Sequence, residues 1–297
     1  MASTSPVASA GAVATAELAR RMPAARRDLS GPIAHAILVA SVALLAFPLY
    51  YAFVISTQTL DEVTSLPPKL MPSTNLAQNY ADAWARVQMG RLLLNSAIVA
   101  LAVALGKIAI SLLSAFAIVY FNFRGKQFVF WMIFITLMLP VPVRIVSTYQ
   151  VVSVLGWVDT YWGLTVPLMA SATGTFLFRQ FFQTMPDSLA EAAQLDGAGP
   201  LRFLWSFLLP LSKANIAALF VILFIYGWND YLWPLIVTNR PEMRTAVIGI
   251  DSLIPRTSQL PEWNVAMAAA MMVLLPPVIV IVVMQRWFVK GLIETEK

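Results

Sequence analysis

The sequence contains no cysteine and only one histidine among its 297 residues, which removes several kinds of chemistry. Without cysteine there is no disulfide, no thiolate nucleophile and no cysteine-ligated zinc or iron–sulfur centre. The single histidine, His35, lies at the start of a long apolar run, where we interpret it as an interfacial residue. We therefore expect no metal site and no catalytic residues in this chain.

Charged residues are also scarce. They make up 12% of the chain, whereas hydrophobic residues make up 59%. In soluble domains, about 25% of the residues are charged and about 45–50% are apolar. The net charge of +5 is distributed over short segments between apolar runs, which is not the single basic face of a nucleic-acid-binding protein. The composition therefore predicts one integral membrane domain.

Six apolar stretches are long enough, or nearly so, to cross a bilayer core, which takes about 20 residues of helix. They lie at about 33–55, 92–120, 128–147, 162–180, 214–237 and 265–284. Backbone amides and carbonyls in lipid must find partners within the segment, so we expect helices. The sequence thus predicts an all-α, polytopic membrane protein with six transmembrane helices.

The first apolar run follows a basic arm, as the apolar region of a signal peptide would, but its length favours a permanent span. It has about 23 residues, whereas the apolar region of a signal peptide has about 7–15. Residues 1–30 are rich in Ala, Ser and Pro and are expected to form a disordered cytoplasmic arm. Residues 31–297 then form the membrane domain.

Lysine and arginine residues are unevenly distributed between the two sides that six spans create, and this bias sets the orientation. With a cytoplasmic N-terminus, that side carries Arg20, Arg21, Arg26, Arg27, Arg124, Lys126, Arg179, Arg202, Lys213, Arg286, Lys290 and Lys297. The opposite side carries Lys69, Arg86, Arg91, Arg240, Arg244 and Arg256. The excess on the first side predicts that both termini are cytoplasmic.

The loop between the fourth and fifth predicted spans contains a short helix signal at 186–198. Ser188 and Glu191 have the spacing of a capping box, and Gly197 stands where a helix would end in a left-handed conformation. We expect the helix to present a low apolar face formed by Leu189, Ala192 and Ala193. From these residues alone, a connecting helix and a docking site for another protein are both open.

This loop resembles the EAA loop of bacterial ABC importer permeases. The shared positions are Glu191-Ala192-Ala193, Gly197 and Leu209-Pro210, and Phe207 stands where the family prefers isoleucine. Residues 226–234 (YGWNDYLWP) and 285–292 (QRWFVKGL) resemble the maltose-type carbohydrate permeases of the same family. Further stretches, among them 94–96, 105–108, 113–119, 130–140, 167–173 and 176–182, resemble permeases for sn-glycerol 3-phosphate. The resemblance covers about residues 33–297.

The resemblance implies a permease subunit of the bacterial inner membrane that imports sn-glycerol 3-phosphate or glycerophosphodiesters. It implies a second, different permease, two copies of a cytoplasmic ATPase and a periplasmic solute-binding protein as partners. Glu191, Ala192, Ala193, Asp196 and Gly197 would form the loop that docks into the ATPase. A neutral sugar or polyol is the alternative solute.

The chain itself lacks a Walker A pattern, so ATP and magnesium are expected in the partner ATPase and no cofactor in this chain. It is then a transport subunit and not an enzyme. A membrane-embedded enzyme, an ion channel or a secondary carrier is a different class of protein that composition alone leaves open. The sequence disfavours an enzyme, because the loops lack a polar catalytic cluster.

Three charged residues fall well inside predicted spans, where a charge costs about 2.5–3.5 kcal/mol on insertion scales and normally faces protein or water. Lys107 and Arg144 are candidates for a path that attracts an anionic solute; the alternatives are an ion pair and an interfacial position. Asp230 is expected to pair with one of them or to end the fifth helix. Trp228 and Asn229 belong with Asp230 to a family motif to which we assign no role.

Overall fold

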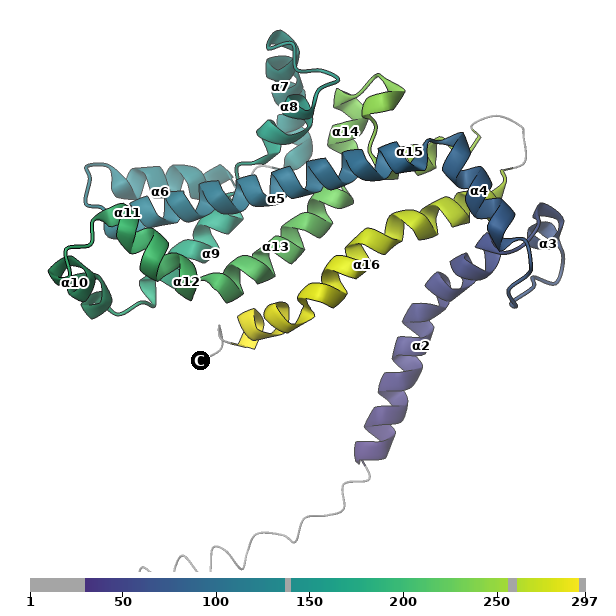
Figure 1. The fold of residues 1–297 in the computed structure, drawn as a ribbon, viewed down its shortest axis with the longest axis horizontal. Coiled ribbons are helices and arrows are strands. Elements are labelled where there is room, and N and C mark those ends of the chain that lie inside the picture. Colours follow the sequence, from purple (N-terminus) through teal and green to yellow (C-terminus); the bar gives the residue numbers. More distant parts are fainter. Residues whose placement is uncertain (1–29, 137–139, 256–260, 294–297) are drawn as a thin grey trace, which may run out of the picture. The chain divides into compact units, whose positions relative to one another are not determined.

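The computed structural model describes residues 30–136, 140–255 and 261–293, and every regular element in these ranges is helical (Figure 1). The chain divides into two compact units, residues 1–51 and 52–297. Residues 1–29, which include nearly all of the predicted arm, lie outside the described residues. The all-α prediction is confirmed over the part of the chain that the structure describes.

Most of helix α2 (Ser30–Ser56) forms the described part of the first unit. Its apolar side chains are exposed over residues 33–50, and Leu44 and Leu45 are 75% and 77% exposed. A helix that is hydrophobic on all sides and has no polar face is typical of a membrane span. Helix α2 coincides with the first predicted span.

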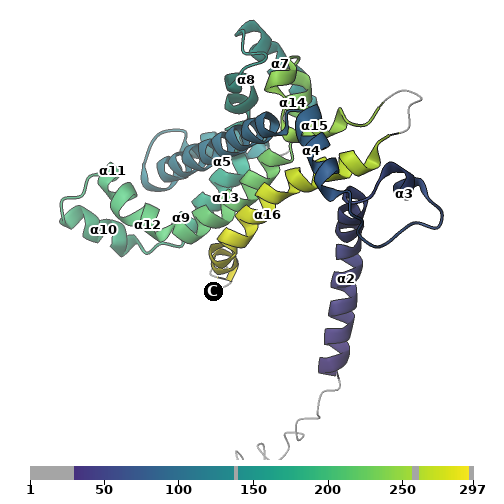
Figure 2. The ribbon, with the colours of Figure 1, turned by 45° about the vertical axis from the view of Figure 1, so that its right-hand side comes forward.

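The core of the second unit is built around α5 (Met89–Tyr120), which is flanked by α9 (Ala172–Gln183) and α13 (Lys213–Trp228). Helix α16 (Trp263–Ile293) packs on α13, so that α5, α13 and α16 lie side by side (Figures 1 and 2). The long helices of the core are apolar and uncharged over most of their length, as membrane spans are.

Small residues allow these helices to approach closely. Ala100, Ala104 and Ala115 on α5 are fully buried. A Cβ added to Gly227 of α13 would lie 3.3 Å from the Cα of Ala100. On the other flank, a Cβ at Gly174 of α9 would lie 2.5 Å from the hydroxyl oxygen of Ser111. The contacts of α5 with α9 and α13 therefore depend on the absence of side chains at these positions.

The remaining helices of the second unit are short and flank or connect this core. Before and after α5 they are α3 (Leu60–Thr64), α4 (Leu76–Arg86), α6 (Lys126–Ile135), α7 (Val141–Val154), α8 (Tyr161–Thr165) and the 3-10 turn η2 (Val166–Leu168). After α9 they are α10 (Asp187–Leu195), α11 (Pro200–Phe203), the π-helical turn η3 (Leu204–Leu208), α12 (Leu209–Leu211), α14 (Leu232–Val237), η4 (Pro241–Met243) and α15 (Ala246–Asp251).

Three helical segments of the described chain are each long and apolar enough to cross a membrane: Gly31–Ser56, Met89–Tyr120 and Trp263–Gln285. Pro200–Leu211 and Lys213–Trp228 would form a fourth span if they are counted together, with a 74° bend between them. The count of six transmembrane helices therefore stays a prediction.

Other predicted spans are interrupted in the structure. The stretch 128–147 falls on α6 and the start of α7, and residues 137–139 between them lie outside the described residues. The stretch 162–180 breaks before α9, because the Ser171 hydroxyl accepts a hydrogen bond from the Gly174 amide (3.2 Å) and starts a new helix. The stretch 214–237 breaks after Trp228, and α14 begins four residues later, at Leu232. Continuous helices through these last two stretches are not observed.

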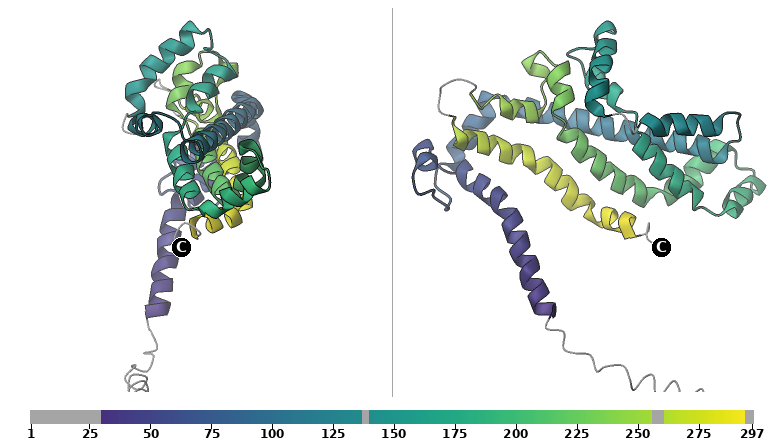
Figure 3. Two further views of the ribbon diagram at one scale, coloured as in Figure 1. Left: turned by 90° about the vertical axis from the view of Figure 1, so that its left-hand side faces the viewer. Right: turned by 180° about the vertical axis from the view of Figure 1, so that it is seen from behind.

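The two ends of α5 carry different sets of short elements. Helices α10 and α11 lie at its C-terminal end, whereas α4 and α15 lie at its N-terminal end (Figures 1 and 3). A helix of this length spans about 48 Å at a rise of about 1.5 Å per residue. Helix α5 thus connects two distant faces of the second unit without a break.

Candidate functional site

Helix α10 occupies the place that the loop pattern predicted, but it starts differently. Pro186 precedes the first turn, and the structure shows no side-chain cap there. Ser188 lies inside the first turn, so the predicted capping box with Glu191 is wrong: a helix that begins at Asp187 leaves Ser188 no free amide three residues ahead to bind as a cap.

The end of α10 agrees with the prediction. Gly197 has a φ of +72°, in the left-handed region that favours glycine. Its amide donates to the Gln194 carbonyl (3.0 Å), and the Ala198 amide donates to the Ala193 carbonyl (2.9 Å). This pair of hydrogen bonds is a Schellman motif, which satisfies two carbonyls at the helix end.

The two faces of α10 differ from the predicted arrangement. Ala193 is buried, and Leu189 packs partly buried against the same core, so neither belongs to the outer face. The outer face carries Glu191, Ala192 and Leu195, and Leu195 is 89% exposed. Sequence reasoning missed Leu195, although it stands three and four residues after Ala192 and Glu191 and therefore on their side of the helix.

Asp196 and Gly197 continue this exposed surface at the C-terminal end of α10. Of the five predicted loop residues, only Ala193 points into the protein, because the α10 residues that pack inward stand at helical spacing from it. The exposed surface of α10 therefore carries two carboxylates beside one large apolar side chain.

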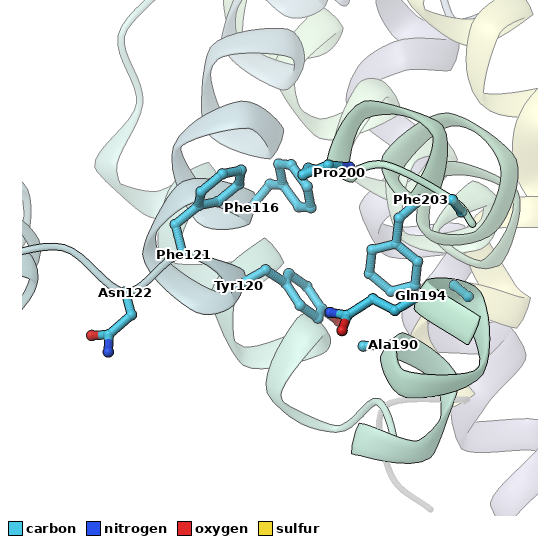
Figure 4. Close-up of a pocket in the computed structure, with 10 residues that line it drawn as sticks. Phe116, Tyr120, Phe121, Asn122, Ala190, Gln194, Pro200 and Phe203 are labelled. Carbon is cyan, nitrogen blue, oxygen red and sulfur yellow. The ribbon is translucent and has the colours of Figure 1, made fainter. Parts of the chain in front are cut away.

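A pocket of about 370 Å³ lies beneath α10, between the end of α5 and α11 (Figure 4). Tyr120 and Phe203 face each other there, with their ring centroids 5.2 Å apart in an edge-to-face arrangement. The lining residues are Phe116, Tyr120, Phe121, Asn122, Ala190, Ala193, Gln194, Ala198, Pro200 and Phe203. Aromatic rings thus lie between α10 and the C-terminal end of α5.

A second group of polar residues surrounds Lys107, which is half-buried near the middle of α5. Its Nζ lies 5.0 Å from the centroid of the Tyr226 ring on α13, a cation–π distance. Asp230 and Arg144 are both near enough for their charges to act on Lys107. The structure therefore brings the three predicted charged residues into one neighbourhood.

The roles of these neighbours differ. The Asp230 carboxylate accepts hydrogen bonds from the backbone amides of Leu232 and Trp233 at the start of α14, so it stabilises the break after α13. Arg144 is exposed on α7. Lys107 and Asp230 are both half-buried, whereas Tyr226, the aromatic partner of Lys107, is 58% exposed.

The other residues of the family motif act at the end of α13. Trp228 is buried, and its indole N–H donates to the Val273 carbonyl of α16 (3.1 Å). Asn229 is exposed and forms the C-cap. We find no cluster of three or more potential metal ligands among the described residues. Side chains after Gln285, including most of the motif at 285–292, lie outside the described part.

Comparisons with known proteins agree on the class of protein. Residues 107–294 match the family described as "Binding-protein-dependent transport system inner membrane component". The sn-glycerol-3-phosphate transport system permease protein UgpE of Agrobacterium fabrum is 55% identical over 278 residues, which cover 91% of this chain and 99% of the relative. The protein of the same name from Yersinia enterocolitica is 52% identical over 269 residues, which cover 89% of this chain and 96% of the relative.

A solved structure shows the same fold. It is described as the crystal structure of a bacterial ABC transporter involved in the import of the acidic polysaccharide alginate. One of its chains superposes on this protein with a TM-score of 0.79 at 20% identity, covering 90% of this chain and 100% of that chain. Because the family match spans more than half of the sequence and the relatives cover most of it, this chain belongs to the binding-protein-dependent transport system inner membrane components and is a transport subunit, not an enzyme.

Proposed function

We propose that this chain is a permease subunit of a bacterial ABC importer and forms half of the translocation path for sn-glycerol 3-phosphate or glycerophosphodiesters. The observation that carries the proposal is the identity of 52–55% to sn-glycerol-3-phosphate permeases over about nine-tenths of the chain. Lys107 and Arg144 support an anionic solute over the alternative, a neutral sugar or polyol. Enzyme, channel and secondary-carrier functions do not fit the family.

The proposed assembly contains a second permease, two cytoplasmic ATPase subunits and a periplasmic binding protein. Both termini of this chain lie in the cytoplasm, as its lysine and arginine distribution predicts. ATP and magnesium belong to the ATPase. The exposed face of α10, with Glu191, Ala192, Leu195 and Asp196, is the surface that contacts it, with Leu195 as the apolar anchor.

The translocation path passes Lys107. Glycerol 3-phosphate carries nearly two negative charges near neutral pH, because the second pKa of a phosphate ester is about 6. Such a charge is costly in an apolar passage unless a cation faces it. Lys107 is held by the exposed ring of Tyr226 and has the single countercharge of Asp230 nearby, whose carboxylate is already bonded to backbone amides. Its ammonium is thus available to a passing phosphate.

The test is uptake by the complete complex in proteoliposomes, with its binding protein supplied on the outside. We expect ATP-dependent uptake of labelled sn-glycerol 3-phosphate that unlabelled glycerol 3-phosphate abolishes and that glycerol or maltose leaves unchanged. ATP hydrolysis should rise only when the binding protein is loaded. Uptake of a neutral sugar, with no competition by glycerol 3-phosphate, would overturn the proposal in favour of the alternative solute.

A further inference from the structure

A second pocket, of about 240 Å³, lies at the opposite end of α5 from α10, where α4 and α15 meet it. Its lining residues are Arg86, Val87, Gln88, Arg91, Leu92, Pro241, Glu242, Arg244, Gly249 and Ser252. Three of them are arginines and one is a glutamate. The pocket is thus a small concave surface with an excess of positive charge.

Two of the three arginines keep their charge free for a ligand. Arg86 forms an ion pair with Glu262, and its Nη2 lies 3.8 Å from a carboxylate oxygen of Asp82. Glu242, the acidic lining residue, pairs with Arg240, which lies outside the pocket; the Arg240 Nε is 3.6 Å from a Glu242 carboxylate oxygen. Arg91 and Arg244 form no ion pair with any residue that the structure describes. The pocket therefore holds two guanidinium groups that form no ion pair within the described chain, although Glu242 lies in the same lining.

Buried hydrogen bonds fix the backbone that carries Arg244. The amide nitrogen of the buried Asn95 side chain donates to the carbonyls of Glu242 (2.8 Å) and Arg244 (2.9 Å). The Ser96 hydroxyl, also buried, accepts from the amide of Ala246 (2.8 Å). Both side chains belong to α5, one turn after Arg91. The two arginines are therefore held on connected backbone, which lowers the cost of ordering them around a ligand.

We infer that Arg91 and Arg244 form a binding site for the phosphate group of a small anion, separate from the Lys107 neighbourhood. Guanidinium groups bind phosphate oxygens in a bidentate manner, and a pocket of this size admits one such group. The identity of the anion rests on the proposed function: the solute's phosphate meets this site first and Lys107 about 24 Å further along α5, at about 1.5 Å per residue. A phospholipid headgroup presents the same chemistry.

The test uses the complete complex without its binding protein, in nanodiscs of phosphatidylcholine alone. The probes are inorganic phosphate and labelled sn-glycerol 3-phosphate, measured by equilibrium binding. We expect the double variant Arg91→Gln/Arg244→Gln to bind both at least roughly tenfold more weakly than the unmodified complex. The control is Arg124→Gln, because this arginine is exposed and lies outside the pocket lining. Basal ATP hydrolysis verifies assembly of every variant.

A second arm separates solute from lipid. In nanodiscs containing phosphatidylglycerol, native mass spectrometry reports lipid retained by the complex. Retained phosphatidylglycerol that the double variant loses, together with no solute binding at the pocket, supports the site and assigns the phosphate to a headgroup. Unchanged binding of phosphate, solute and lipid in the double variant overturns the inference.

A third outcome points to a different partner. If the double variant binds phosphate normally but needs more loaded binding protein for half-maximal ATP hydrolysis, the arginines contact that protein and the anion site is refuted. Failure of the proposed function can be told apart from failure of this inference. If the complex transports a neutral sugar, binding of inorganic phosphate can still be compared between the unmodified complex and the double variant.

Discussion

Lys107 combines a charge, a half-buried position and an aromatic partner in the middle of an otherwise apolar helix. We expect Lys107→Met, which keeps most of the side-chain volume, to lower the uptake of labelled glycerol 3-phosphate at least about tenfold, because an interaction with a charged group contributes about 1.5–3 kcal/mol. The measurement is initial uptake at matched abundance in the membrane.

Two comparisons make this result specific. Arg124→Gln removes an exposed positive charge outside the helices and should leave uptake unchanged. Arg144→Gln should reduce uptake less than Lys107→Met, because Arg144 is exposed and free to move. Normal uptake in the Lys107→Met/Arg144→Gln double variant would show that the anion passes elsewhere. Loss of the complex itself would show that Lys107 instead forms a structural ion pair.

Gly197 is a position where backbone conformation, and not contact, limits the side chain. It has a φ of +72°, and nothing lies within 4 Å of an added Cβ. We expect Gly197→Val to destabilise the end of α10 by about 1–2 kcal/mol, whereas Gly197→Asn, a residue that tolerates this conformation, should be mild. The measurement is ATP hydrolysis stimulated by loaded binding protein, which should fall in the first variant only.

Gly125 provides the matched control for this variant. It also has a positive φ (+84°) and open space around it, but it precedes α6 and not the end of α10. Gly125→Val therefore imposes the same kind of backbone strain away from the proposed ATPase contact. Equal losses of stimulated hydrolysis in Gly125→Val and Gly197→Val would mean that strain, and not the end of α10, is responsible.

At the scale of elements, the contact between α5 and α9 depends on Gly174. Because an added Cβ would lie 2.5 Å from the Ser111 hydroxyl oxygen, we expect Gly174→Ala to destabilise the complex by about 1–3 kcal/mol, as overpacking does. Gly199→Ala meets open space and should be neutral. Thermal unfolding of the purified complex measures both. If Ser111→Gly does not restore stability to Gly174→Ala, the collision is not the cause.

The short helices also show what the sequence predicts and what it does not. The position of α10 and its stop at Gly197 follow from local rules, because a left-handed glycine acts on the residues next to it. Ser188 is not the cap because the helix starts two residues earlier than the capping box predicts, and local patterns do not specify helix ends to this precision. The pocket of Phe116, Tyr120 and Phe203 was missed because its walls are distant in sequence and meet only when α11 folds back on α5.

The breaks in the predicted spans have a similar cause. Apolar composition predicts that 214–237 lies in the membrane, but it does not distinguish one helix from two. Two side chains determine that the stretch forms two helices. The Asp230 carboxylate accepts hydrogen bonds from the start of α14, and the buried Trp228 indole donates a hydrogen bond to α16. A local contact of Asp230 and a tertiary contact of Trp228 therefore set where these helices end, whereas composition predicts only which stretches are apolar.

For the whole molecule, the absence of cysteine offers a direct test of orientation. Leu195 and Leu66 are each 89% exposed, and the proposed topology places them on opposite sides of the membrane. In the complex without the ATPase, a membrane-impermeant thiol reagent should label Leu195→Cys only in inside-out vesicles and Leu66→Cys only in right-side-out vesicles. Labelling of both variants in the same vesicles would contradict the orientation inferred from the positive residues.

Helix α5 contains no proline and no break between Met89 and Tyr120, with the arginine pocket at one end, Lys107 near the middle and the aromatic pocket at the other end. If such a helix tilts as a rigid rod about its centre, its two ends move in opposite directions. The distance from Arg91 to Tyr120 along the axis is about 44 Å, so a tilt of about 5° displaces each end by roughly 2 Å, in opposite directions. We therefore expect a displacement of α10 to change the shape of the arginine pocket at the opposite end of α5, because the helix between them is unbroken.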